Sequence, residues 1–198
     1  AAALRHQFAI EASRVDGAIL PALWEVLGVR AFDHLRGMYS ICVHDTNTGE
    51  TWLAVDPLGL KSLYVADSPK GTVFASELTP VANVGGRYTI QQGAKKIYDR
   101  YGCLPARSSG VVGIERFIPG EYRRFDKSGH EIERGRISTA GWRTADPTGW
   151  DDVVAAFIGS VEAHLMSDVP IALMLSSGVD SSAIAWAAAE LGQRLDCF

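Results

Sequence analysis

Cysteine is scarce in this sequence, and long apolar runs are absent from it. The three cysteines, Cys42, Cys103 and Cys197, are odd in number, far apart and without metal-ligand spacing, which is typical of a reducing compartment. No stretch approaches the roughly 20 apolar residues that a membrane span needs, and the first residues carry no signal-peptide pattern. We therefore expect a cytoplasmic protein with no membrane partner, in which each cysteine fills space in a core.

Clustered positive charge is missing as well. The 198 residues include 19 Lys and Arg against 23 Asp and Glu, which gives a net charge of −4, and the basic residues are scattered. This distribution offers no footprint for a nucleic-acid backbone, so we expect no nucleic-acid partner. The five histidines share no ligand spacing, and no metal is assigned to them. A hydrophobic content of 47% is ample for the core of one domain or two small ones.

Short alternating segments dominate the first part of the chain and predict a β-rich fold. Apolar residues at helical spacing first predict a helix with Asp16 as its N-cap and Gly28 as its stop. Further helices are predicted over 31–35 and 91–101, and strands over 38–45, 50–56, 62–66, 72–76, 113–118 and 122–126. The first four strands, joined by tight turns, indicate one antiparallel sheet.

The last part of the chain has a different pattern. A polar segment with Gly141 and Pro147 predicts a linker over 134–150. Asp151 then caps a helix with one apolar face, and strand, loop, helix and strand follow over 169–175, 176–182, 183–191 and 194–198. This order is the opening βαβ unit of a parallel α/β domain. The chain starts within a helical pattern and stops within a strand-like run, so both ends look cut.

The loop over 176–182 has the residue types of an anion site. The first N–H groups of the following helix have no partner within the helix, and the positive end of the helix dipole lies behind them. Gly178 lets an oxygen-rich group approach the backbone, and serine hydroxyls surround it. The lysine of a Walker loop is absent. Asp180 would repel a bare phosphate but can hold Mg²⁺ against a polyphosphate, so the loop predicts a metal–nucleotide site.

The same loop resembles the pyrophosphate-binding loop of the N-type ATP pyrophosphatases, whose usual form is Ser-Gly-Gly-x-Asp-Ser. Ser177 stands at a position where this motif usually has glycine, and the approach over 164–170 is similar to that of asparagine synthetases. The resemblance implies ATP and Mg²⁺ as cofactors, with Asp180 as the metal ligand. It implies a site for ATP or pyrophosphate made of Leu175, Ser176, Ser177, Gly178, Val179, Asp180, Ser181 and Ser182. For the six-residue motif alone, a serine-rich N-cap on an ordinary βα unit is the alternative.

Four strings in the first part of the chain resemble the class II glutamine amidotransferase domain of asparagine synthetases, in the same order. They are Gly37-Met38-Tyr39-Ser40, Asp56-Pro57-Leu58-Gly59-Leu60-Lys61-Ser62-Leu63-Tyr64, Phe74-Ala75-Ser76-Glu77, and the segment 113–122. The resemblance implies an α+β amidotransferase domain with an Ntn-hydrolase-like sheet over 1–133 and a linker over 134–150. An α/β Rossmann-like ATP pyrophosphatase (PP-loop) domain follows over 151–198, and both domains are expected to be incomplete.

The glutaminase machinery of that family is not found in these residues. The family uses an N-terminal cysteine as nucleophile and an Asn-Gly-Glu motif as oxyanion site, and neither occurs here. We therefore assign no catalytic residue for glutamine hydrolysis to the chain and expect it to be inactive alone. Asp16 falls where the family's Ser-Asp-x-Glu motif holds the glutamine amino group, although a plain helix cap explains this residue equally well.

The resemblance implies a glutamine-hydrolysing asparagine synthase. Such an enzyme adenylates aspartate with ATP and uses ammonia from glutamine, giving asparagine, AMP and pyrophosphate. The expected partners are these small substrates, and a homodimer is compatible with the sequence. Two alternatives stay open: an amide-forming cyclase of the β-lactam synthetase or lasso-peptide cyclase type, and a non-catalytic paralogue that acts as a partner module. A cysteine at the true N-terminus would distinguish the synthetase from the cyclase.

Overall fold

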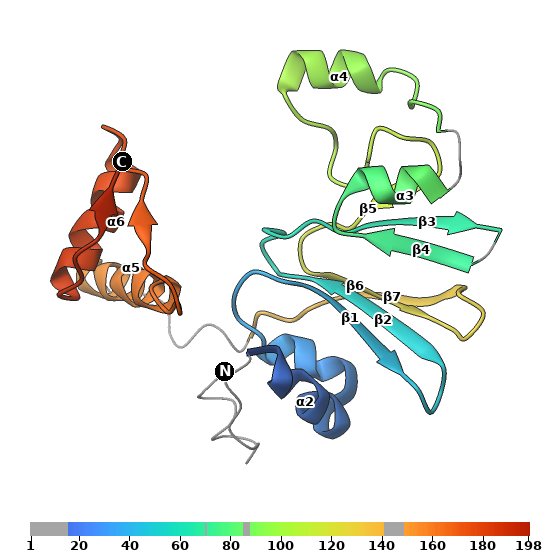
Figure 1. Cartoon of the computed structure of the whole chain (residues 1–198), viewed down its shortest axis with the longest axis horizontal. Coiled ribbons are helices and arrows are strands. Elements are labelled where there is room, and N and C mark those ends of the chain that lie inside the picture. The colour runs from blue at the N-terminus through green and yellow to red at the C-terminus, as the bar shows by residue number, and fades with distance from the viewer. Residues whose placement is uncertain (1–15, 70, 85–87, 141–148) are drawn as a thin grey trace. The chain divides into compact units, whose positions relative to one another are not determined.

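The computed structural model describes residues 16–69, 71–84, 88–140 and 149–198, which belong to two compact units (Figure 1). The units are Ala1–Trp142 and Arg143–Phe198. The division falls inside the segment predicted as a linker, although Gly141 and Pro147 themselves lie outside the described residues. Of the helices in the described part of the chain, none is long and apolar enough to cross a membrane.

Two antiparallel sheets form the centre of the first unit. The larger sheet has the order β1-β2-β6-β7, with bounds Ser40–Asp45, Glu50–Val55, Glu121–Phe125 and Glu131–Arg136. The smaller has the order β4-β3-β5, with bounds Gly71–Ala75, Tyr64–Ser68 and Ile114–Arg116. Apolar side chains of both sheets share one core: Leu53, Val55, Leu63, Val65, Phe117 and Phe125. The prediction that the first four strands form a single sheet was therefore wrong.

Helices cover the outer faces of the two sheets (Figure 1). The turn η1 (Asp16–Ala18), the helix α2 (Ile19–Leu27) and the 3-10 segment η2 (Gly28–His34) pack on the larger sheet, where Leu23 and Phe32 contact Trp52 and Ala54. On the smaller sheet, α3 (Leu78–Val84) buries Val81 and Ala82, and α4 (Ala94–Tyr101) follows in the chain. The sequence analysis missed α3, which has only seven residues and includes Pro80.

The chain passes from one sheet to the other through a loop that a buried carboxylate organises. Asp56 is 0% exposed, and its carboxylate accepts the N–H groups of Leu58, Leu60 and Lys61 at 3.1, 3.0 and 2.9 Å. These bonds supply hydrogen-bond partners to a carboxylate that is removed from water. Gly59 has a φ of +66°, and a Cβ there would lie 2.8 Å from Pro119 Cγ. The Asp-x-x-Gly spacing in this segment therefore has a structural reason.

Charged side chains occupy part of the space between the sheets. Glu121 and Arg123 on β6 are 1% and 2% exposed, and their Oε1 and Nε atoms lie 3.2 Å apart. Arg107 Nη1 reaches Glu121 at 2.7 Å, Arg123 Nη2 reaches Glu115 at 2.8 Å, and Arg123 lies 4.4 Å above the Phe117 ring. The inter-sheet ion network consists of Arg107, Glu115, Glu121, Arg123, Glu131 and Arg134. It joins β5 of the smaller sheet to β6 and β7 of the larger one.

This network predicts a loss of stability in acid. Burial by itself raises the pKa of Glu121, but the hydrogen bonds from Arg107 and the Ile118 N–H and the charge of Arg123 outweigh it and lower that pKa. The pKa of Glu131 is lowered in the same way, chiefly by Arg134. A depressed carboxyl pKa stabilises the fold above the unfolded value of about 4.3, and this stabilisation is lost as pH falls through the folded value.

We expect the free energy of unfolding, measured in urea, to fall steeply below about pH 4. The variant Glu121→Gln, which carries no titrating group at this position, should show a shallower pH dependence over the same range. An equal slope in the variant and the parent chain would show that Glu121 does not contribute.

The second unit contains a parallel βαβ arrangement. After α5 (Trp150–His164), β8 (Ala172–Leu173) pairs in parallel with β9 (Asp196–Cys197), and α6 (Val179–Glu190) connects the two strands. The helices pack through Val161, Ala187 and Ala188, with Phe157 and Leu191 beside them. The predicted order of strand, loop, helix and strand is therefore present, although each strand is two residues long.

The structure corrects several expected boundaries and environments. Strand β7 continues to Arg136 because it pairs with β6 as far as Glu121, so residues 134–136 are not linker. Helix α5 begins at Trp150 with Gly149 as N-cap, which leaves Asp151 in the first turn rather than at the cap. All three cysteines are exposed, so the expectation that they fill cores was wrong.

Candidate functional site

The predicted nucleotide loop joins the end of β8 to the start of α6. The Leu175 N–H donates to the Phe198 carbonyl at 2.9 Å, so pairing with the last strand extends to the residue before the loop. Gly178 is the N-cap of α6, with an extended backbone at φ −78° and ψ 151° and no side-chain cap. The helix begins at Val179, four residues earlier than predicted, which places Asp180 in its first turn.

Serine hydroxyls hold this loop in shape. Ser176 Oγ accepts the Gly178 N–H at 3.2 Å and lies 3.0 Å from Ser181 Oγ. Ser181 Oγ is also 3.0 Å from the Ser176 carbonyl, and Ser182 Oγ donates to the Gly178 carbonyl at 2.9 Å. A Cβ at Gly178 would lie 3.1 Å from Ser176 Oγ, closer than most real contacts. The Ser176, Ser181 and Ser182 hydroxyls therefore organise the loop itself.

The groups left to bind a ligand are mainly backbone donors. The N–H groups of Val179, Asp180 and Ser181 stand in the first turn of α6, where no helix carbonyl can accept them. The positive end of the helix dipole lies at the same place. Residues 176–180 are exposed, and Val179 reaches 80% exposure. The loop is therefore open to solvent, and its free donors suit phosphate oxygens.

Asp180 is the carboxylate of this loop. In the described residues there is no group of three or more His, Cys, Asp or Glu side chains that could hold a metal ion by itself. Mg²⁺ in nucleotide sites is commonly held by one or two carboxylates together with substrate phosphates. A single exposed carboxylate beside free N–H groups fits that arrangement, in which a nucleotide would supply further ligands to Mg²⁺.

Asp16 is the predicted contact of a glutamine amino group. The structure places it as the first residue of η1, one turn before α2. The N-cap of α2 is Ala18, which makes no side-chain cap, so the expectation that Asp16 caps this helix was wrong. The 3-10 turn separates Asp16 from the helix start. The Asp16 side chain lies outside the described positions, and its ligand role stays a prediction.

From the sequence, we predicted that serine hydroxyls of the loop contact phosphate. We did not predict the hydrogen bonds that these hydroxyls form within the loop. The signal was available, because a serine two residues before a backbone N–H is typical of a local hydroxyl turn. Ser176 and Gly178 have that spacing. Ser177 has no such bond among the described contacts of the loop, and its contact with a ligand stays a prediction.

Comparisons with known proteins match the two units to two families. The glutamine amidotransferase domain family matches residues 2–135, and the asparagine synthase family matches residues 152–198. A protein named "putative asparagine synthetase (glutamine-hydrolyzing)" from Mycobacterium bovis is 30% identical over 96% of this chain and 31% of its own length. Asparagine synthetase (glutamine-hydrolyzing) 1 of Bacillus subtilis is 27% identical over 92% of this chain and 29% of its own length.

The chain spans under a third of the length of these two relatives. A solved structure of the glutamine phosphoribosylpyrophosphate amidotransferase from B. subtilis aligns with 100% of this chain and 41% of that one, at 18% identity and a TM-score of 0.42.

Proposed function

Because the chain belongs to the glutamine amidotransferase domain family and continues into an asparagine synthase segment, we propose that it is part of a glutamine-dependent amide ligase. The specific reaction we propose is adenylation of aspartate by ATP, followed by amidation with ammonia from glutamine. The products are asparagine, AMP and pyrophosphate. The observation that carries the proposal is the exposed loop at the start of α6, with free backbone donors beside one carboxylate.

Each part of the loop has a role in this proposal. The N–H groups of Val179, Asp180 and Ser181 bind phosphate oxygens, and Gly178 leaves room for their approach. Asp180 would hold Mg²⁺, and Mg²⁺ bound there would supply positive charge to stabilise the pyrophosphate leaving group. The hydroxyls of Ser176 and Ser181 keep the turn open in this geometry. Leu175 borders the nucleotide.

Glutamine hydrolysis and the amidation step need groups other than the residues of this loop. Attack on an acyl adenylate requires a neutral amine, whereas ammonium predominates in neutral water. A ligase that obtains ammonia by hydrolysing glutamine can deliver it unprotonated to the adenylate. Asp16 is the residue we propose to contact the glutamine amino group. Cytoplasmic location and a homodimer remain predictions.

The test is a product assay on the full-length protein. With Mg–ATP, aspartate and glutamine, we expect asparagine and pyrophosphate to form in equal amounts, measured by amino-acid chromatography and a coupled pyrophosphate assay. Omitting aspartate should abolish pyrophosphate release. The cyclase alternative would be favoured if pyrophosphate release does not depend on glutamine or ammonia and requires an acid other than aspartate. Failure to bind Mg–ATP at millimolar concentration would favour the non-catalytic alternative.

A further inference from the structure

A cavity of about 240 Å³ lies at one end of the first unit, away from the predicted nucleotide loop in sequence. The β1–β2 turn, the start of β4 and the β6–β7 turn contribute residues to it, at the right-hand end of the sheets in Figure 1. The hairpin cavity, as we name it, is lined by His44, Gly49, Thr51, Leu53, Gly71, Thr72, Phe74, Phe125, Asp126, Lys127, Ser128 and Gly129.

Close contacts between the turns hold the walls of the hairpin cavity in place. The Thr72 hydroxyl donates to the Gly129 carbonyl, which ties β4 to the β6–β7 turn. Gly129 has a φ of +83°, and a Cβ there would lie 3.1 Å from the Thr72 nitrogen. A Cβ at Gly49, whose φ is +73°, would lie 3.0 Å from Lys127 Cβ. The glycines therefore let the three backbones meet, and the walls are formed before any ligand arrives.

The floor of the hairpin cavity is apolar. Leu53 and Phe125 belong to the core between the sheets and are 0% and 4% exposed. Phe74 on β4 also lines the space and is 41% exposed. Because Leu53 and Phe125 are almost fully covered, the exposed Phe74 ring is the surface that favours an apolar group of the ligand.

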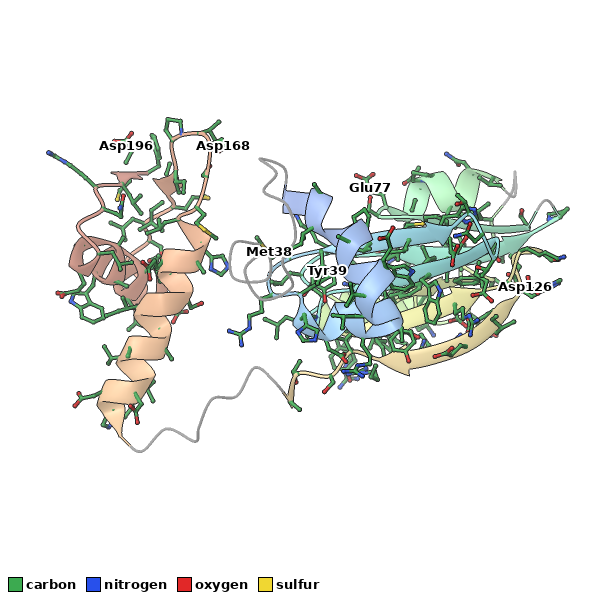
Figure 2. The ribbon with its side chains drawn as sticks, turned by 90° about the horizontal axis from the view of Figure 1, so that it is seen from below. Met38, Tyr39, Glu77, Asp126, Asp168 and Asp196 are labelled. Carbon is green, nitrogen blue, oxygen red and sulfur yellow. The ribbon has the colours of Figure 1, made fainter. Side chains whose placement is uncertain are left out.

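The rim carries two opposite charges on neighbouring residues. Asp126 Oδ1 accepts hydrogen bonds from the N–H groups of Ser128 and His130 at 2.8 and 2.9 Å. These bonds lower the pKa of the Asp126 carboxyl, and the bond from His130 has the larger effect. Asp126, labelled in Figure 2, is therefore ionised at neutral pH. Within the described part of the chain, no carboxylate lies within ion-pair distance of the Lys127 ammonium group. One cationic and one anionic residue thus line the same cavity as the Phe74 ring.

We propose that the hairpin cavity binds a free α-amino acid with an apolar side chain. The carboxylate of such a ligand pairs with Lys127, its ammonium group pairs with Asp126, and its side chain contacts the exposed Phe74 ring. The cavity has the volume of about eight water molecules and is smaller than the pockets of drug-sized ligands, which suits a single small ligand. The lining residues of this site do not include Asp16 or any residue of the proposed nucleotide loop.

The test compares three shape-matched probes on the 198-residue chain by isothermal titration calorimetry. L-leucine carries both charges, 4-methylpentanoate lacks the ammonium group, and 3-methylbutylamine lacks the carboxylate. We expect L-leucine to bind and each single-charge probe to bind at least tenfold more weakly. Equal binding of all three, or no binding of L-leucine at millimolar concentration, would overturn the proposal.

Variants assign the binding to this cavity. Lys127→Gln should lower the affinity of the chain for L-leucine at least tenfold and leave its affinity for 3-methylbutylamine unchanged. Lys96→Gln, an exposed lysine on α4, is the matched control and should leave both affinities unchanged. Both lysines are exposed, so circular dichroism should show an unchanged fold. Unaltered L-leucine binding to Lys127→Gln would show that the ligand binds elsewhere and that the proposal is wrong.

Discussion

Replacing Arg123 with leucine is expected to lower the free energy of unfolding by about 3–5 kcal/mol, because it removes the buried cation beside the buried Glu121 carboxylate. Arg123 is 2% exposed and reaches Glu121, Glu115 and Glu131 at 3.2, 2.8 and 3.3 Å. Its loss removes the positive charge shared by three strands. Urea unfolding at neutral pH measures the effect, and the midpoint should shift without a large change in slope.

Two further variants separate charge burial from simple loss of packing. Arg30→Leu removes an exposed arginine from η2 of the same unit and should change stability by less than about 0.5 kcal/mol. The double variant Glu121→Gln with Arg123→Leu removes one carboxylate together with the cation, and it should recover part of the loss. If the double variant is as unstable as the sum of the single variants, the ion pair is not the cause.

Replacing Asp180 with alanine in the full-length protein is expected to slow pyrophosphate release at least about 100-fold, because Mg²⁺ then has no protein carboxylate beside the phosphates. Asp180 lies in the first turn of α6, so its removal also costs about 0.3–1 kcal/mol of helix stabilisation. That cost is too small to unfold the domain. Steady-state assays at several Mg²⁺ concentrations should show a raised metal requirement in the variant.

The control for Asp180 stands on the same helix. Glu190 is an exposed carboxylate at the last residue of α6, away from the loop, so Glu190→Ala should keep the parent rate and metal requirement. Asp180→Asn, which keeps the shape and removes the charge, should behave like Asp180→Ala. An Asp180→Ala protein with the parent Mg²⁺ dependence would contradict the metal-ligand role.

Local features of the chain were predictable because neighbouring residues supply the interactions that produce them. The apolar spacing of α5 and the small residues before α6 act within a few positions, so their helices followed from the pattern. The anion-binding donors at the start of α6 come from the helix geometry itself. The serine hydroxyls around Gly178 also form hydrogen bonds with residues nearby in the chain. From the sequence, we predicted contacts of these hydroxyls with a ligand and not these local bonds.

The orientation of strand β6 could not be predicted from the sequence pattern. Its residues alternate, but Glu121 and Arg123 face the interior between the sheets together with Phe125, whereas Tyr122 packs beside Phe32 and Trp52 under the helices. An alternating pattern identifies the two faces of a strand. It does not show which face packs against the other sheet and which packs against the helices. Charged residues can face inward here only because strands β5 and β7 bring compensating charges to the same place.

The sequence by itself determined that a serine-rich loop precedes α6 and that the β-rich part precedes the α/β part, because these signals lie in contiguous residues. The tertiary structure alone decided the division into two sheets, the burial of Asp56 and the charge network, and the hairpin cavity. Each of these features depends on strands or turns that are distant in the chain, and pairing between distant segments is set by the packing of the whole unit.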